Sequence, residues 1–292
     1  MLECRLVGAV LAEATDSLKR ANIADARREA LTIWASLAGL DIGQVWLLQQ
    51  ETADAPMVER FGRALARRLA GEPFAYVVGT AGFRTLDLAV DSRVLIPRPE
   101  TEGLVERVLA WSARRWTGGV GSWGTVVDVG TGSGCVALSL AAEGRFRRVL
   151  ATDTAAAALD VARHNYETVA PGTPVEFHLG AGLDPVHDAE PDVIVSNPPY
   201  LTAAEFAALD RCVRDYEPRA ALVGGSDGME QISALLFDAM DVLAAGGLLA
   251  IEIDSSRADL AWRLAREAGW HSARVEADLF ARQRYLLATK ES

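Results

Sequence analysis

Apolar residues in the first part of the chain recur at the spacing of an α-helix. Within residues 25–40 the apolar positions on one face are Ala26, Ala30, Ile33, Trp34 and Leu37. Side chains three or four residues apart share a helix face, because an α-helix has about 3.6 residues per turn. Gly39 is typical of a helix end, and Pro56 is typical of a helix start. Residues 1–71 are therefore predicted to form a small helical bundle.

A short connecting segment follows the helical region. Gly71 and Pro73 interrupt the helical pattern. Apolar residues then alternate loosely, as in a short β-hairpin, at Phe83, Leu86, Leu88 and Val90. Two prolines hold the chain extended before a helix that should begin at Glu100 or Thr101. Residues 72–98 are therefore predicted to be a connecting hairpin and linker.

From Thr125 onward, short continuous apolar runs are separated by alanine-rich helical segments. The runs occupy residues 125–130, 148–153, 174–179, 192–197 and 248–253. Continuous hydrophobicity indicates strands that are buried on both faces, as in a parallel sheet covered by helices. Residues 271–289 hold two more runs without room for a helix between them, which predicts a final antiparallel hairpin. Residues 99–292 are predicted to be an α/β domain with a mostly parallel seven-stranded sheet.

The overall composition narrows the class of protein. Of the 292 residues, 50% are hydrophobic and 24% are charged, the usual balance of a folded soluble protein. The net charge of −11 argues against direct nucleic-acid binding, because Lys and Arg supply the affinity for phosphates. No apolar run approaches the roughly 18 residues of a membrane span, and the N-terminal residues are unlike a signal peptide. We expect a cytoplasmic monomer without membrane contact. The scattered cysteines and histidines have no metal-ligand spacing, so no metal site is predicted.

Two predicted strands end in residues that suit a nucleoside. The first run ends in a turn formed by Gly130, Thr131, Gly132, Ser133 and Gly134. Glycines let the backbone turn tightly and approach a ligand closely, with a helix N-terminus beyond. Asp153 ends the next run, 23 positions after Gly130 (153 − 130), where an acid can accept both ribose hydroxyls. Each feature alone could be structural, as a tight connection or a helix N-cap, but together they favour a nucleoside site.

A third strand ends in a rigid turn formed by Asn197, Pro198, Pro199 and Tyr200. Each proline keeps the residue before it out of the α region, so Asn197 and Pro198 are both held extended. A side-chain amide and a backbone carbonyl therefore point outward together. These acceptors can bind both hydrogens of an –NH₂ group, and Tyr200 can pack against the planar group that bears it. The alternative is a turn with a purely structural role.

A nucleoside site beside a binding site for a planar –NH₂ group predicts methyl transfer from S-adenosylmethionine to an amine or amide nitrogen. Such a nitrogen is a poor nucleophile because its lone pair is delocalised. Holding both N–H groups directs the lone pair toward the sulfonium methyl and stabilises the positive charge that develops on nitrogen. No strong general base is required before the attack, because the nitrogen becomes acidic only once it is alkylated. The predicted catalytic residues are Asn197, Pro198 and Tyr200.

From about Gly71 to the C-terminus the chain resembles the bacterial release-factor glutamine methyltransferases, the PrmC/HemK group. The similar blocks, in the order of that family, are GEPFAYVVG, VLIPRPETE, DVGTGSG, VSNPPY and YEPRAALVGGSDG. The helical region matches more loosely, chiefly through DARREA. The resemblance implies a Rossmann-like class I methyltransferase fold, with S-adenosylmethionine as the methyl donor. It implies N5-methylation of the glutamine in the Gly-Gly-Gln motif of peptide-chain release factors, and a helical domain that helps hold this protein substrate.

The resemblance also implies a set of site residues. The implied cofactor-binding residues are Gly130, Thr131, Gly132, Ser133, Gly134 and Asp153, and the predicted cofactor site also includes Gly182 and Asn197. The implied substrate-binding residues are Asn197, Pro198, Pro199 and Tyr200. The chain departs from the family near the adenine, where Ala181 and Gly182 replace an acid and an aromatic residue. Asp254 stands where glycine is common.

Other functions stay open at this point. A sister enzyme methylates a ribosomal-protein glutamine, but the PRPETE form of residues 97–102 favours release factors. Enzymes that methylate exocyclic amines of DNA or RNA bases share the Asn/Asp-Pro-Pro-Tyr element, because those amines are planar too. Such enzymes must also extrude and hold a nucleotide. The negative net charge of this chain argues against a nucleic-acid substrate. A nucleoside-binding module without catalysis is the non-enzymatic alternative, which the intact Asn-Pro-Pro-Tyr turn disfavours.

Overall fold

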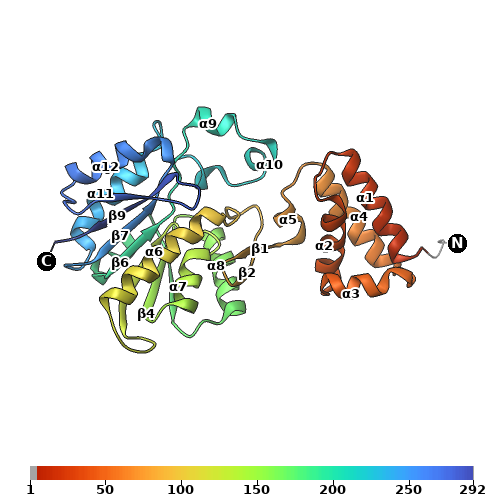
Figure 1. The fold of residues 1–292 in the computed structure, drawn as a ribbon, viewed down its shortest axis with the longest axis horizontal. Helices are drawn as coiled ribbons and strands as arrows, with labels where there is room; N and C mark the ends of the chain where they lie inside the picture. Colours follow the sequence, from red (N-terminus) through yellow and green to blue (C-terminus); the bar gives the residue numbers. More distant parts are fainter. Residues whose placement is uncertain (1–4, 292) are drawn as a thin grey trace. The chain divides into compact units, whose positions relative to one another are not determined.

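The computed structural model describes residues 5–291, which fall into two compact units (Figure 1). The first unit runs as far as Thr80 and also contains Asp210–Tyr216. The second unit consists of Ala81–Leu209 and the residues from Glu217 onward.

The first unit is helical. Its helices are α1 (Val7–Arg20), α2 (Ala26–Ala38), α3 (Ile42–Leu47), α4 (Ala55–Leu69), α5 (Phe74–Val78) and α10 (Arg211–Arg214), with the 3₁₀ turn η1 (Leu48–Gln50). The predicted face of α2 is confirmed, because its residues Ala26, Ala30, Ile33 and Trp34 are at most 3% exposed. α2 ends at Gly39, whose φ of 65° is a left-handed conformation that glycine adopts without strain. α5 lies inside the predicted linker, between Pro73 and Gly79.

No single helix within residues 5–291 is long and apolar enough to cross a membrane. Ala26–Ala38 and Ile42–Gln50 pass that test only together, as a pair bent by 102°.

The second unit contains a seven-stranded sheet with the strand order β5-β4-β3-β6-β7-β9-β8. Its strands are β3 (Trp123–Val129), β4 (Phe146–Asp153), β5 (Val175–Leu179), β6 (Val193–Ser196), β7 (Leu248–Glu252), β8 (Arg274–Ala277) and β9 (Gln283–Thr289). β3 to β7 pair in parallel, whereas β9 is antiparallel to both β7 and β8. The predicted sheet and its final hairpin are therefore confirmed. The hairpin predicted before the sheet forms a separate pair of strands, β1 (Thr80–Phe83) and β2 (Leu86–Ala89).

Helices cover both faces of the sheet, which explains the continuous hydrophobicity of its strands. α6 (Pro99–Arg115), α7 (Cys135–Glu143) and α8 (Ala156–Val169) contribute to one core, and α11 (Glu230–Val242) and α12 (Ala258–Glu267) to the other. Successive strand residues alternate between these cores: Val126 packs in the first and Val127 in the second. The connections contain α9 (Ala203–Ala207), η2 (Asp184–Ala189), η3 (Arg219–Ala221) and η4 (Ser255–Arg257). α6 begins at Pro99, slightly before the predicted start, because proline suits the first turn of a helix.

The strand order reverses beside β3, because β4 lies on one side of it and β6 on the other. In open α/β sheets ligands bind at such a switch point, outside the carboxyl ends of the strands. The residues that follow β3, β4 and β6 therefore meet at one edge of the sheet.

Candidate active site

A cavity of about 460 Å³ opens at the carboxyl ends of β3, β4 and β6. Its volume lies within the range of about 300–1,000 Å³ that is usual for small-molecule sites. The predicted site residues on its wall are Gly130, Gly132, Asp153, Gly182, Asn197, Pro198 and Pro199. A neighbouring cavity of about 40 Å³ is lined by Gly130, Gly132 and Asn197 as well, together with Thr131 and Ser133. Of the predicted residues, Gly134 and Tyr200 line neither cavity.

The loop after β3 is shaped by glycines with positive φ. The φ angle is 75° at Gly130 and 55° at Gly132, and a Cβ at either position would project into open space. Other residues rarely adopt these conformations, so glycine opens the backbone toward the cavity. Gly134 has a different role at the start of α7. A Cβ there would lie 3.1 Å from Leu138 and 3.3 Å from Ala162, so its glycine allows close helix packing.

A buried acid, Asp128, binds this loop through hydrogen bonds. Asp128 is 1% exposed and accepts hydrogen bonds from the Thr131 hydroxyl at 2.7 Å and the Ala137 N–H at 3.1 Å. Burial raises the pKa of Asp128 to about 7, although both hydrogen bonds lower it. An acid within an apolar run, shortly before Gly130, is the sequence signal by which this residue could have been found.

Asp153 ends β4 and contacts the glycine loop. One carboxylate oxygen accepts the Gly132 N–H and the other accepts the Ala155 N–H, each at 2.9 Å. A carboxylate has about four acceptor positions, so both oxygens keep capacity for a ligand. Because Asp153 also lines the cavity, its geometry suits recognition of a ribose diol.

The turn after β6 presents an amide group to the cavity. Asn197 Nδ2 donates a hydrogen bond to Thr101 Oγ1 at 3.0 Å. Thr101 lies in the first turn of α6 and is 2% exposed. With its NH₂ group turned toward Thr101, the Asn197 amide has its Oδ1 available as an acceptor. Asn197 and Pro198 line the same cavity as Asp153, which brings the two halves of the predicted site together.

Tyr200 lies outside the cavity wall. Its side chain packs against the core that α11 and α12 cover. Burial raises the pKa of its hydroxyl to about 12. The contact between Tyr200 and a planar substrate group stays a prediction.

Two glycines allow another loop to press against the Asn-Pro-Pro-Tyr turn. The Gly224 N–H donates to the Leu201 carbonyl at 2.9 Å. A Cβ on Gly224 would lie 2.0 Å from the Pro199 carbonyl oxygen, and one on Gly228 would lie 2.2 Å from that of Tyr200. A backbone approach this close requires glycine. The loop that contains Gly224 and Gly228 therefore packs directly against the backbone of the turn and supports it.

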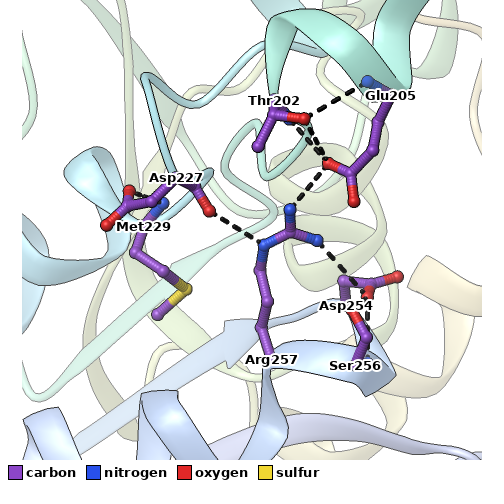
Figure 2. A network of polar contacts seen from close by, with 7 residues as sticks. All are labelled: Thr202, Glu205, Asp227, Met229, Asp254, Ser256 and Arg257. Carbon is purple, nitrogen blue, oxygen red and sulfur yellow. Dashed lines mark hydrogen bonds and ion pairs between the residues drawn. The ribbon is translucent and has the colours of Figure 1, made fainter.

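An ionic network holds the segment that follows the turn. Figure 2 shows Arg257 at its centre. The Arg257 guanidinium donates to Glu205 Oε2 at 2.6 Å and to the Asp227 carbonyl at 3.1 Å, and lies 3.5 Å from Asp254 Oδ1. The Thr202 N–H and Arg257 lower the pKa of Glu205 to about 2. The network joins α9 to the loop that contains Gly224 and Gly228 and to the residues after β7, and it gives Asp254 a structural partner.

A second ion pair anchors the PRPETE segment beside the cavity. Glu217 has a side chain that is 1% exposed, and it binds Arg98 Nη2 at 2.6 Å. Its other oxygen accepts the Ile96 N–H at 3.1 Å. Arg98 and Glu217 lie in two of the blocks that resemble the family, but only the fold shows that they form an ion pair. Leu95 and Ala220 of the same two blocks line the cavity, and wall residues without a local sequence signal are Asp184, Gln231, Leu235 and Asp238.

The cavity fits S-adenosylmethionine in size and in the chemistry of its wall. The glycines with open space at their Cβ positions allow close backbone approach, and Asp153 can accept hydroxyl groups. The residues that would hold the cofactor are Gly130, Gly132, Asp153 and Gly182. Across residues 5–291 no cluster of three or more His, Cys, Asp or Glu could hold a metal ion.

Replacement of Asp153 by alanine is expected to weaken S-adenosylmethionine binding and to leave the fold intact. The loss of charge-assisted hydrogen bonds to a diol should cost on the order of 1.5–3 kcal/mol. Titration calorimetry measures the affinity, and thermal melting checks the fold. Asp160→Ala is the matched control, because this acid is exposed on α8 and pairs only with Arg163, at 3.3 Å, among the described ion pairs. Unchanged affinity in Asp153→Ala would remove this residue from the cofactor site.

The chain is similar in sequence to known proteins. Residues 9–79 match the family described as PrmC N-terminal domain, and residues 120–216 match the Methyltransferase small domain. A protein of Streptomyces coelicolor named release factor glutamine methyltransferase is 34% identical over 288 residues, which cover 98% of each chain. A protein of Moorella thermoacetica with the same name is 40% identical over 242 residues, 82% of this chain and 83% of that one.

One solved structure supports the fold alone. The T. thermophilus 16S rRNA N2 methyltransferase RsmC, in complex with AdoMet and guanosine, has a TM-score of 0.50 and 18% identity. The similar region covers 73% of this chain and 50% of that one.

Proposed function

The chain belongs to the family of release factor glutamine methyltransferases, and from this premise we propose its reaction. The protein transfers a methyl group from S-adenosylmethionine to the side-chain nitrogen, N5, of the glutamine in the Gly-Gly-Gln motif of peptide-chain release factors. The observation that carries the proposal is the position of Asn197 and Pro198. Both residues line the same cavity as the glycine loop and Asp153.

The rigid turn holds the amide that is methylated. Asn197 Oδ1 accepts one hydrogen of the substrate –NH₂ group and the Pro198 carbonyl accepts the other. With both hydrogens held, the amide cannot rotate, and its nitrogen lone pair is directed toward the cofactor side of the cavity. S-adenosylmethionine supplies an electrophilic methyl group when it is bound there.

The same acceptors stabilise the charge that develops on nitrogen. As the lone pair leaves the amide conjugation, the N–H groups become more acidic and their hydrogen bonds to Asn197 and Pro198 strengthen. One N–H proton is lost once the nitrogen carries the methyl group. No strong base has to remove it before the attack, which agrees with an amide and a carbonyl as the two groups that hold the substrate.

The reaction is tested with methyl-labelled S-adenosylmethionine and three separate acceptors: release factor, ribosomes and DNA. We expect label on the release factor, located by mass spectrometry on the glutamine of the Gly-Gly-Gln motif. A variant release factor with that glutamine replaced by alanine is the control and should stay unlabelled. Label that appears only on ribosomes or DNA would contradict the proposal.

We further propose that residues 1–71 form a domain that docks the protein substrate, that 72–98 connect it, and that 99–292 form the catalytic domain. In support, the helical unit has its own core, with buried residues such as Ile33, Trp34 and Phe61. It contains none of the residues that line the cavities described above.

Deletion of the residues before Gly71 is expected to spare S-adenosylmethionine affinity but to impair methylation of intact release factor. A short Gly-Gly-Gln peptide serves as the control substrate, because it needs no docking surface outside the cavity. The truncated protein should methylate this peptide at the rate of the full chain. Full efficiency on intact release factor, with a folded truncated protein, would refute the docking role.

A further inference from the structure

We propose that Thr101 and Glu252 are positioning residues that orient the Asn197 amide toward the methyl acceptor. The inference deepens the proposed function and rests on it, because it concerns the group that holds the substrate nitrogen. Neither residue lines the main cavity, and Thr101 lines only the smaller cavity beside Asn197, which places its effect on the substrate through the Asn197 amide.

The three side chains come from elements that only the fold brings together. Thr101 lies 96 positions before Asn197 and accepts the hydrogen bond from its Nδ2 at 3.0 Å. Glu252 ends β7, which pairs with β6 through Ser196 and Ile251. Asn197 and Glu252 therefore follow these paired residues at the same level of the sheet. Thr101 is 2% exposed and Glu252 is 1% exposed, so neither group can exchange its partner for bulk water.

Thr101 also interacts with Glu252. A hydrogen bond from the Thr101 side chain lowers the pKa of the Glu252 carboxyl, although burial outweighs it and raises that pKa to about 7. Arg284 and Arg98 also favour the ionised carboxylate, whereas Glu100 opposes it. Thr101 is thus the link between the buried carboxyl and the amide that faces the substrate.

The chemistry of these groups gives the chain of hydrogen bonds one direction. An ionised carboxylate only accepts hydrogen bonds, and a hydroxyl has one proton and two lone pairs. When the Glu252 carboxyl is ionised, it accepts the Thr101 proton, and a lone pair of Thr101 accepts from Asn197 Nδ2. The Asn197 amide is left with Oδ1 as the group that can accept a substrate N–H. In the reverse orientation its NH₂ group would face the –NH₂ group of the substrate, donor against donor.

The burial of the Glu252 carboxyl is energetically unfavourable unless its oxygens have partners. Glu252 Oε2 has no hydrogen-bond partner among residues 5–291, and an unpartnered buried polar atom is unfavourable. An ionised carboxyl at this position can keep the Thr101 proton away from Asn197 Oδ1, which gives the buried acid a role in the orientation of the amide.

The test compares Thr101→Val with Thr101→Ser. Valine keeps the shape of threonine but removes the hydroxyl, so the Asn197 amide loses its fixed orientation. We expect kcat on release factor to fall by up to about 100-fold, as for a misplaced reacting group. The affinity for S-adenosylmethionine should change less than about twofold, because the contact concerns the acceptor nitrogen. Serine keeps the hydroxyl and should restore most of the activity, which a packing role for the threonine methyl group would not predict.

A double-mutant cycle shows whether Thr101 acts through Asn197. Single-turnover rates are measured for Thr101→Val, Asn197→Ala and the double variant, since coupled residues have non-additive effects. We expect Thr101→Val to cause no further loss in the Asn197→Ala background. Glu252→Gln should behave like a weaker form of Thr101→Val, because a glutamine can also donate to Thr101 and permit the reversed amide.

The outcomes separate this inference from the proposed function. A wild-type protein that transfers no methyl group to release factor overturns the proposed function. If the wild type is active, the inference alone is overturned by a folded Thr101→Val variant with near wild-type kcat. It is likewise overturned if the losses from Thr101→Val and Asn197→Ala multiply in the double variant.

Discussion

Asn197→Ala is expected to lower the single-turnover rate of methyl transfer by on the order of 10²–10³, as is typical when one preorganised polar partner is removed. The Pro198 carbonyl alone would leave the substrate amide free to rotate. The effect should fall on turnover, with little change in S-adenosylmethionine affinity, because the contact strengthens as charge develops on nitrogen. The measurement is a single-turnover assay on purified release factor at saturating S-adenosylmethionine.

Asn197→Asp is the informative companion of this variant. It keeps the size of the side chain and an oxygen that can accept the substrate N–H, so it should retain more activity than alanine. If Asn197 served only to shape the turn, both variants would lose thermal stability together and keep their specific activity. Melting temperatures measured beside the rates distinguish these cases. A folded Asn197→Ala protein that works at nearly the wild-type rate would refute the proposed mechanism.

Gly224→Ala is expected to have the second largest effect, a decrease in turnover on the order of 100-fold. The added Cβ would lie 2.0 Å from the Pro199 carbonyl oxygen and 3.1 Å from Tyr200 Cα. Both are backbone atoms, so no side-chain rotation relieves the overlap. The turn would have to move by roughly 1 Å or more to restore ordinary contact distances, which displaces the Asn197 and Pro198 acceptors from the substrate amide.

Gly119→Ala is the matched control for this substitution. A Cβ at Gly119 meets no atom within 4 Å, and its φ lies outside the left-handed region. Its rate should equal that of the wild type. The affinity of Gly224→Ala for S-adenosylmethionine, measured by calorimetry, should stay close to normal, since Gly224 does not line the cavity. Normal turnover in a folded Gly224→Ala protein would show that the loop does not support the turn.

The local features of the fold could be predicted because they depend on neighbouring residues. The buried face of α2 follows from helical spacing, and the strands from continuous apolar runs. The ends of these elements follow from residues such as Gly39 and Pro99, whose backbone preferences act within a turn. α5 is the exception, since a run of five residues between Pro73 and Gly79 is too short for periodicity to identify a helix.

Those residues of the candidate site that follow a strand could also be predicted from the sequence. The glycine loop, Asp153 and Asn197 each stand at a strand end, where the order of residues along the chain carries the signal. The sequence by itself therefore determined the helical region, the alternating strands and helices, and the residues that line the cavity at Gly130, Asp153 and Asn197.

Only the tertiary structure decided which distant residues act on that site. Strand order brings β6 beside β3 and β7, so that Asn197 stands near both Asp153 and Glu252. Thr101 reaches Asn197 across 96 positions, and no local pattern specifies such a pair. Gly224 presses on Pro199 only because a loop folds back onto the turn. Periodicity and backbone preference act over a few residues, whereas contacts between elements depend on how their buried faces pack together.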